Sequence, residues 1–204
     1  MSQPFIITGL PRCREAWLSV LTTTDRTLCR FHPLLGISDK EELPHLFEST
    51  FYSHVGLADS SLSLFLGYLL KTVKPKVVIV DRDIEDVLVS QERIGAPRSN
   101  VPELMRQELL KYREHPDVLW VPYETLDRKR TIQRIFFHLL PGIPFDEERY
   151  ESLAKMKIGI HLEDAGAEYM ARKPQMDHLL REWLPKFTQA VGAPQGVRGN
   201  GQTR

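Results

Sequence analysis

Residues 4–19 read PFIITGLPRCREAWLS, in which a short apolar run is followed by a cationic loop and then by apolar residues at helical spacing. Phe5–Ile7 form a run typical of a strand that is buried on both faces. A glycine and a proline end the strand, and Arg12 and Arg14 follow at once. The exposed N–H groups at a helix start attract anions, and the two arginines add positive charge at the same place. The stretch therefore indicates a phosphate-binding loop; the other interpretation is an ordinary strand-to-helix turn with two solvated arginines.

The composition predicts a single folded domain with a substantial hydrophobic core. The chain has 204 residues, of which 42% are hydrophobic and 26% are charged, a balance typical of a globular domain rather than a disordered chain. We expect residues 1–191 to form that domain, with a final helix over residues 174–191. Residues 192–204 are rich in Gly, Gln and Arg, and we expect them to be a disordered tail.

The charge balance and the cysteine count restrict the partners and the compartment. Lys plus Arg and Asp plus Glu both total 27, so no basic excess favours a nucleic-acid partner, and any anion site must be local. Cys13 and Cys29 are too few for a disulfide framework, and the sequence has neither a signal-peptide pattern nor an apolar stretch long enough to span a bilayer. We therefore expect a cytoplasmic protein without a membrane partner. The histidines and cysteines lack the spacing of metal ligands, so no metal is expected.

Short apolar strands alternate with helices along the rest of the chain. Strands are expected over residues 27–32, 51–55, 76–80 and 118–121. Helices are expected over residues 39–49, 62–72, 84–93, 100–114, 131–140 and 146–156. This alternation predicts an α/β domain with a central, mostly parallel sheet, helices on both faces and further C-terminal helices. Because ligands of such folds bind beyond the carboxyl ends of the strands, we expect one cleft to be shared by the Arg12 loop, His32, the segment after Val55, Arg82 and Tyr123.

A second informative stretch is residues 78–91, VIVDRDIEDVLVSQ. It places Arg82 at the end of a strand and Ser90 eight residues later, two turns along the following helix, which allows both side chains to face one phosphate. The alternative is a strand that ends in a salt-bridged arginine and is followed by a helix with an ordinary serine.

Together, the two stretches resemble the motifs of the P-loop sulfotransferases, which use 3′-phosphoadenosine 5′-phosphosulfate (PAPS) as sulfuryl donor. The first motif of that family is a strand followed by Pro-(Lys/Arg)-Ser-Gly-Thr-Thr-Trp, and residues 11–17 of this chain read PRCREAW. The second motif is a strand ending in Arg-Asp-Pro with a serine eight residues after the arginine, which Arg82, Asp83 and Ser90 match. Residues 123–126, YETL, resemble the family's Tyr-Glu-Asp-Leu segment. Order and separation agree across residues 4–126.

The resemblance implies a three-layer P-loop fold that binds PAPS and releases 3′-phosphoadenosine 5′-phosphate (PAP). The loop is then expected to hold the 5′-phosphosulfate, and Arg82 with Ser90 the 3′-phosphate. The donor-binding residues implied in this way are Arg12, Cys13, Arg14, Glu15, Ala16, Trp17, Arg82 and Ser90.

Sulfuryl transfer also needs a cation at the leaving phosphate and a base at the acceptor. Arg12 matches the family's loop lysine or arginine, which stabilises the leaving phosphate. The two candidates for the base are His32, at the end of the second strand, and His54, after the third extended segment. Asp59 lies near His54 in the sequence and is suited either to orient an acceptor or to cap the next helix.

Three loop residues depart from the family pattern, with Cys13 in place of serine, Arg14 in place of glycine and Glu15 in place of threonine. A carboxylate at position 15 repels a phosphosulfate unless it turns away or pairs with Arg12 or Arg14. Glu15 also fits a first-turn acid that the helix dipole favours. Cys13 is either a thiol whose pKa is lowered at the helix start or a small residue in place of serine.

The first functional hypothesis is a PAPS-dependent sulfotransferase acting on a hydroxyl or amine acceptor, whose identity the sequence leaves open along with the oligomeric state. The second, motivated by Glu15, is a non-catalytic descendant of the fold that binds a nucleotide without turnover. The third is a kinase-like phosphotransferase, against which the missing Gly-Lys-Ser/Thr of nucleoside triphosphatases counts.

Overall fold

A computed structural model describes residues 2–93 and 98–156, together with residues 178, 179, 181 and 185. The strands of this part are β1 (Gln3–Gly9), β2 (Thr27–Phe31), β3 (His54–Ala58), β4 (Lys76–Asp81) and β5 (Val118–Pro122). They form one parallel sheet in the order β2-β3-β1-β4-β5. The predicted α/β architecture with a parallel sheet is therefore confirmed.

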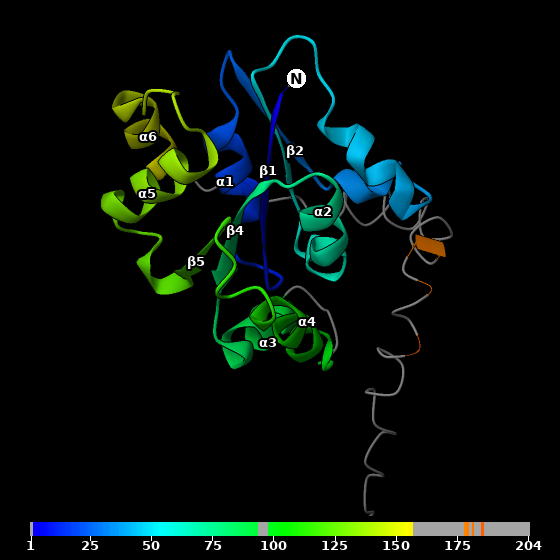
Figure 1. Cartoon of the computed structure of the whole chain (residues 1–204). Helices are drawn as coiled ribbons and strands as arrows, with labels where there is room; N and C mark the ends of the chain where they lie inside the picture. The colour runs from blue at the N-terminus through cyan, green and yellow to red at the C-terminus, as the bar shows by residue number, and fades with distance from the viewer. Residues whose placement is uncertain (1, 94–97, 157–177, 180, 182–184, 186–204) are drawn as a thin grey trace, which may run out of the picture.

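Helices cover both faces of this sheet. The α-helices are α1 (Glu15–Thr22), α2 (Leu66–Thr72), α3 (Ile84–Glu92), α4 (Val101–Leu110), α5 (Lys129–Leu139) and α6 (Glu147–Ala154). The 3₁₀ segments are η1 (Pro33–Gly36), η2 (Lys40–Phe47), η3 (Ser60–Phe65) and η4 (Tyr123–Thr125). Figure 1 shows α1, α5 and α6 on one side of the sheet and α2 and η2 on the other, where α4 packs on η3 and β1.

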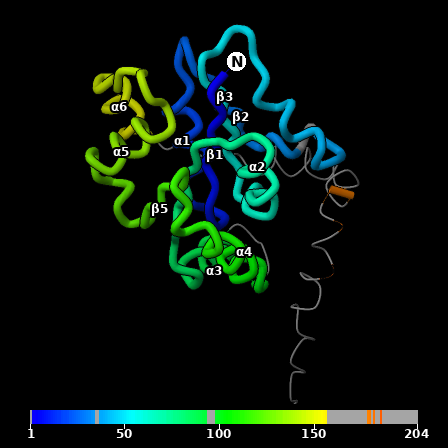
Figure 2. The backbone as a smooth tube through the Cα atoms, viewed as in Figure 1, coloured from blue at the N-terminus to red at the C-terminus, as the bar shows by residue number. Residues whose placement is uncertain are grey.

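The central strand β1 fixes the position of the candidate site. Its residues Phe5, Ile6 and Ile7 are fully buried, and each such side chain contributes about 1.5–3 kcal/mol by leaving water. Phe5 lies opposite Gly56 of β3, where a Cβ would stand 2.1 Å from the Phe5 ring, so the glycine makes room for the aromatic side chain. Because all strands run in parallel, the loops after them meet at one end of the sheet, here called the carboxyl end. The tube in Figure 2 shows α3 and α4 at this end and the N-terminus at the other.

The third strand differs from the prediction. A strand or extended segment was expected over residues 51–55, whereas β3 runs from His54 to Ala58. Phe51 is 90% exposed and so adds nothing to the packing that stabilises a strand. The pairing of His54 with Gln3, and of Ala58 with Ile7, instead buries all of β3 beside β1. His54 is therefore the first residue of the strand, and the expectation that it follows the strand is wrong.

Two of the expected helices contain 3₁₀ segments, one along its whole length and the other at its start. The helix expected over residues 39–49 is the 3₁₀ segment η2, because Pro44 in its interior has no N–H to donate. Asp39 caps it by accepting from the N–H of Glu41. Asp59 caps η3, which continues into α2, so the capping interpretation of Asp59 is confirmed. The final helix expected over residues 174–191 and the expected tail lie largely or wholly outside the described residues.

In the described part of the chain, no helix is both long enough and apolar enough to cross a bilayer.

Candidate active site

The loop between β1 and α1 has the backbone geometry of an anion-binding loop. A Cβ on Gly9 would lie 2.3 Å from the carbonyl oxygen of Val80, so only glycine lets the loop leave the sheet so close to β4. Arg12 and Arg14 both adopt left-handed backbone conformations, with φ values of 69° and 65°. Left-handed residues that alternate with other backbone conformations, as Arg12 and Arg14 do on either side of Cys13, turn successive N–H groups toward one concavity, which favours an anion. Each non-glycine residue held there costs about 1–3 kcal/mol, a cost that typically persists at functional sites.

The structure brings Arg12, Arg82 and Ser90 together at the carboxyl end of the sheet. Arg82, just after β4, donates from Nη1 to the carbonyl oxygen of Arg12 at 2.8 Å. The Nε atom of Arg12 lies 3.5 Å from Oγ of Ser90 on α3, which is a long hydrogen bond. The Nε atom of Arg82 is buried and has no hydrogen-bond partner among the described residues. A buried donor without a partner is a position that an incoming acceptor, such as a phosphate oxygen, satisfies.

Tyr123 joins this cluster from the end of β5. The guanidinium carbon of Arg82 lies 4.3 Å from the centre of its ring, and that of Arg14 lies 5.6 Å from it. Arg14 also forms an ion pair with Asp127, at 2.7 Å between Nη1 and Oδ1. The Arg14 guanidinium is thus paired with a carboxylate beyond η4. Asp127 was not predicted, because it lies beyond the resembling segment and its sequence gives no signal of a partner in the loop.

Glu15 lies inside the loop rather than toward solvent. Its side chain is buried, and Oε2 accepts a hydrogen bond from the N–H of Cys13 at 3.1 Å. Its other oxygen, Oε1, is buried without a hydrogen-bond partner in the described part of the chain. The pKa of Glu15 is raised to about 7, chiefly by burial and also by the charge of Asp59, although hydrogen bonds from backbone N–H groups and the charge of His32 act in the opposite direction. Among the described contacts Glu15 pairs with neither loop arginine, because Arg12 contacts Ser90 and Arg14 contacts Asp127.

His32 and Asp59 form a pair between the ends of β2 and β3. The Nδ1 atom of His32 lies 3.2 Å from Oδ2 of Asp59. Asp59 is anchored in turn, since its Oδ1 accepts from the N–H of Ser61 at 2.8 Å and its carbonyl oxygen accepts from the hydroxyl of Thr8 at 2.9 Å. The side chain of His32 is 40% exposed and that of Asp59 only 7%. A buried carboxylate therefore orients a solvent-accessible imidazole, an arrangement suited to a general base. Sequence reasoning named each residue but not the pair, because the two lie 27 positions apart.

His54 lies at the opposite end of the sheet from this site. It pairs with Gln3 and Thr27, the first residues of β1 and β2. Its Nδ1 atom lies 3.0 Å from the hydroxyl of Ser53, and burial followed by the charge of Arg26 lowers its pKa. The structure therefore does not bring His54 to the cleft in which we expected a base.

The remaining loop residues contribute structure rather than charge. The indole of Trp17 donates to the carbonyl oxygen of Leu153 at 3.0 Å and packs edge-on against Tyr150, so it joins α1 to α6 and does not face the loop. Cys13 is fully buried, and burial raises the pKa of its thiol, so the interpretation of a thiol with a lowered pKa is wrong. Ala16 lies in the first turn of α1, where its backbone N–H is one of the groups without an intrahelical partner.

Among residues 2–93 and 98–156, no three His, Cys, Asp or Glu side chains cluster in a way that could hold a metal ion.

Comparison with known proteins identifies the fold. No family model matches the chain, and no match was found among curated proteins. Mouse sulfotransferase SULT7A1, in a complex with PAP, is 13% identical and matches with a TM-score of 0.51 over 75% of this chain and 64% of the mouse protein. This chain thus spans less than two thirds of that protein's length.

Two further solved structures match with lower TM-scores. A sulfotransferase from Alicyclobacillus acidocaldarius is 14% identical, with a TM-score of 0.45 over 89% of this chain and 96% of that one. The sulfotransferase domain from the curacin biosynthetic pathway is 12% identical, with a TM-score of 0.49 over 78% of this chain and 81% of that one. The match to the mouse protein shows that this chain has a sulfotransferase-like α/β fold, as its two motifs predicted.

Proposed function

We propose that this protein binds PAPS at the carboxyl end of its sheet and transfers the sulfuryl group to a hydroxyl or amine acceptor. The observation that carries the proposal is the meeting of Arg12, Arg82 and Ser90, which come from two separate sequence motifs. The sulfotransferase-like fold and the PAP bound to the mouse protein support the choice of nucleotide.

The residues present fit a ligand with two anionic groups. Arg82 has a buried Nε–H without a partner among the described residues, and Ser90 has a hydroxyl within reach of the same cluster, so these two would hold the 3′-phosphate. The N–H groups of the loop and the guanidinium of Arg12 would hold the 5′-phosphosulfate. Charge-assisted hydrogen bonds of this kind are roughly twice as strong as neutral ones. When bound, PAPS supplies an electrophilic sulfur and a phosphate leaving group.

His32 and Arg12 divide the chemistry between them. His32, oriented through Nδ1 by Asp59, removes the proton of the acceptor, and the buried carboxylate stabilises the imidazolium that results. Arg12 stabilises the negative charge that develops on the leaving phosphate. Asp59 acts through His32 and is therefore a positioning residue.

A second candidate function is nucleotide binding without turnover. The observation that favours it is the hydrogen bond between the Glu15 carboxyl and the N–H of Cys13, because the carboxyl uses a backbone donor that the 5′-phosphosulfate needs. Detection of sulfur transfer separates the two candidates.

The experiment compares the binding of PAP and adenosine 5′-phosphate by calorimetry, in the wild type and in Arg82→Ala. We expect PAP to bind more tightly, and the substitution to weaken PAP roughly 10- to 150-fold, or about 1.5–3 kcal/mol, without affecting adenosine 5′-phosphate. Arg113→Ala is the matched control, because Arg113 is another arginine stacked on an aromatic ring, that of Trp120, and is exposed. Equal affinity of the wild type for the two nucleotides refutes the donor site.

Incubation with PAPS carrying radioactive sulfur and a panel of acceptors then tests transfer, and PAP binding without transfer favours the second candidate.

A further inference from the structure

The Glu15 carboxyl occupies a backbone donor of its own loop. Oε2 accepts from the N–H of Cys13 at 3.1 Å, and Oε1 is buried without a partner in the described part of the chain. The side chain is 7% exposed, so it is held against the core rather than free to swing into solvent. The loop thus has a carboxyl group at the place where a bound phosphate group is expected.

The charged groups that act on Glu15 from neighbouring elements have opposite effects. The charge of Asp59, at the end of β3, raises the pKa of Glu15, whereas that of His32, at the end of β2, lowers it. Within the loop, the neighbouring group is the buried thiol of Cys13, on which the charges of Asp81, at the end of β4, and of Arg82, just after it, also act.

The three arginines of the site have other partners. Arg12 contacts Ser90, Arg14 contacts Asp127, and Arg82 contacts the Arg12 carbonyl and the Tyr123 ring. The loop arginines therefore do not supply the ion pair that an ionised Glu15 needs.

An ionised carboxylate and a phosphate are both acceptors, so they compete for the same N–H groups. Displacement of the buried side chain frees the N–H of Cys13, whereas protonation removes the negative charge that repels a phosphate and turns one carboxyl oxygen into a donor. We infer that the nucleotide binds with Glu15 protonated, so that binding takes up a proton and Glu15 contributes an O–H donor to the 5′-phosphate. This inference rests on the proposed function and assigns Glu15 a specific role within that donor site.

The ionisation of Glu15 makes this uptake easy near neutral pH. Because burial raises its pKa to about 7, close to half of the free protein already carries the proton at that pH. If only the protonated form binds, the affinity for PAP falls about tenfold as the pH rises from 6 to 8.

The test is calorimetry of PAP binding at pH 6, 7 and 8, in buffers with different ionisation enthalpies, which reports the number of protons taken up. The variants are Glu15→Gln, a neutral side chain that keeps a donor and an acceptor, and Glu148→Gln, a matched control in the first turn of α6. The phosphates of PAP titrate near pH 6 and contribute equally to every variant, so comparison with Glu15→Gln removes their effect.

We expect the wild type and Glu148→Gln to take up nearly one proton more than Glu15→Gln at pH 8. Glu15→Gln should then bind PAP about tenfold more tightly than the wild type at pH 8, and about equally at pH 6. Equal proton uptake and parallel pH profiles in the wild type and Glu15→Gln overturn the inference and leave the donor site standing. PAP binding by Glu15→Gln but not by the wild type at any pH also overturns it, because Glu15 then blocks the loop. Absence of PAP binding in every variant overturns the proposed function itself.

A spectroscopic measurement on the wild type covers the case in which Glu15→Gln does not fold. The ¹³C chemical shift of the Glu15 carboxyl distinguishes the protonated form from the ionised form. At pH 8 we expect it to move to the protonated value when PAP is added, and an ionised carboxylate in the complex refutes the inference.

Discussion

The burial of Glu15 predicts a pH dependence of stability that does not depend on the proposed function. In the folded protein, burial raises the pKa of this carboxyl from its ordinary value of 4.5 to about 7. Below pH 4.5 the group is protonated in both the folded and the unfolded chain, so it has no effect on the free energy of unfolding. As the pH rises past 4.5, the unfolded chain releases the proton while the folded protein retains it, so folding becomes less favourable. The full loss is reached above pH 7.

The size of this loss follows from the two pKa values. One pKa unit corresponds to about 1.4 kcal/mol, so the free energy of unfolding should be about 3 kcal/mol lower above pH 7 than it would be without the ionisation of Glu15. Glu15→Gln removes the titration and keeps an oxygen that accepts from the N–H of Cys13. The substitution should therefore be stabilising at pH 8 relative to its effect at pH 5, by about 2.5 kcal/mol.

Urea unfolding of the wild type, Glu15→Gln and Glu148→Gln at pH 5 and pH 8 measures this effect. The difference between Glu15→Gln and the wild type should grow by about 2.5 kcal/mol from pH 5 to pH 8, because part of the effect is already present at pH 5. The difference between Glu148→Gln and the wild type should stay nearly constant, because Glu148 is exposed. A difference between Glu15→Gln and the wild type that is independent of pH refutes the reasoning, because it means that Glu15 ionises as freely in the folded protein as in the unfolded chain.

Two further predictions concern other residues of α1 and the site. Asparagine tolerates the left-handed backbone of position 32 and can still donate to Asp59. In His32→Asn, PAP affinity should therefore be unchanged, while sulfur transfer should fall roughly 100-fold or more. Retained transfer in the radiolabel assay rules out His32 as the base. Trp17→Phe removes the hydrogen bond to the Leu153 carbonyl, so it should lower the free energy of unfolding by about 0.5–1.5 kcal/mol without changing PAP affinity. A weaker PAP affinity in calorimetry would mean that Trp17 contributes to the donor site.

The features that the sequence predicted correctly are those determined by local pattern. The apolar runs over residues 5–7 and 76–80 identified β1 and β4, because strands buried on both faces need apolar side chains in succession. The spacing of Arg82 and Ser90 predicted that both side chains could face one phosphate, and in the structure both residues contact Arg12.

The features that it missed depend on register and on contacts between elements. Residues 51–55 have a composition that favours a strand, yet the hydrogen bonds to β1 place the start of β3 at His54. A shift of three residues is enough to move a histidine from one end of the sheet to the other. The pairing of Arg14 with Asp127 joins residues 113 positions apart, and no local pattern encodes it.

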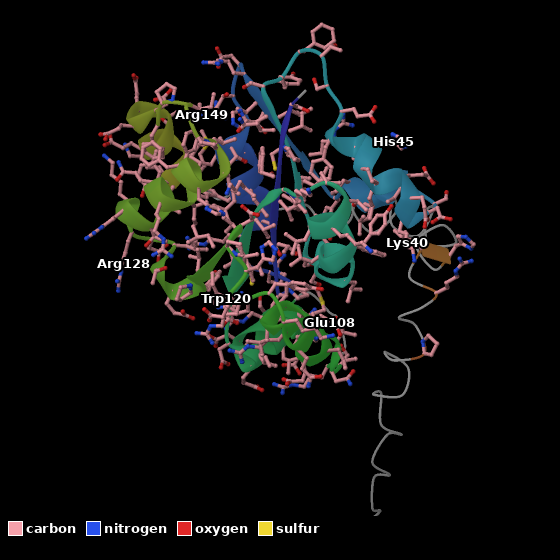
Figure 3. The ribbon with its side chains drawn as sticks, viewed as in Figure 1. Lys40, His45, Glu108, Trp120, Arg128 and Arg149 are labelled. Carbon is pink, nitrogen blue, oxygen red and sulfur yellow. The ribbon has the colours of Figure 1, made fainter. Side chains whose placement is uncertain are left out.

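The same distinction between local and long-range contacts applies to Arg149 and to the aromatic side chains around it. Arg149, labelled in Figure 3, donates from α6 to the carbonyl oxygens of Val20 and Thr23 at the end of α1. Together with Trp17, it fixes α6 against α1, the helix that begins after the Arg12 loop. The described part of α6 thus supports the position of the loop without contributing a charge to it.

Asp59 and His32 differ in what their structural roles require, and this difference bears on whether the site is catalytic. Asp59 caps η3 through the N–H of Ser61, so the fold needs an acceptor there even in a protein that only binds nucleotides. His32 occupies a left-handed position, with φ at 51°, that glycine or asparagine adopts at lower cost. This backbone conformation, together with the contact to a buried carboxylate, supports the proposal that His32 transfers a proton. For this reason the activity of His32→Asn, rather than the mere presence of Glu15 in the loop, distinguishes an enzyme from a nucleotide-binding protein of the same fold.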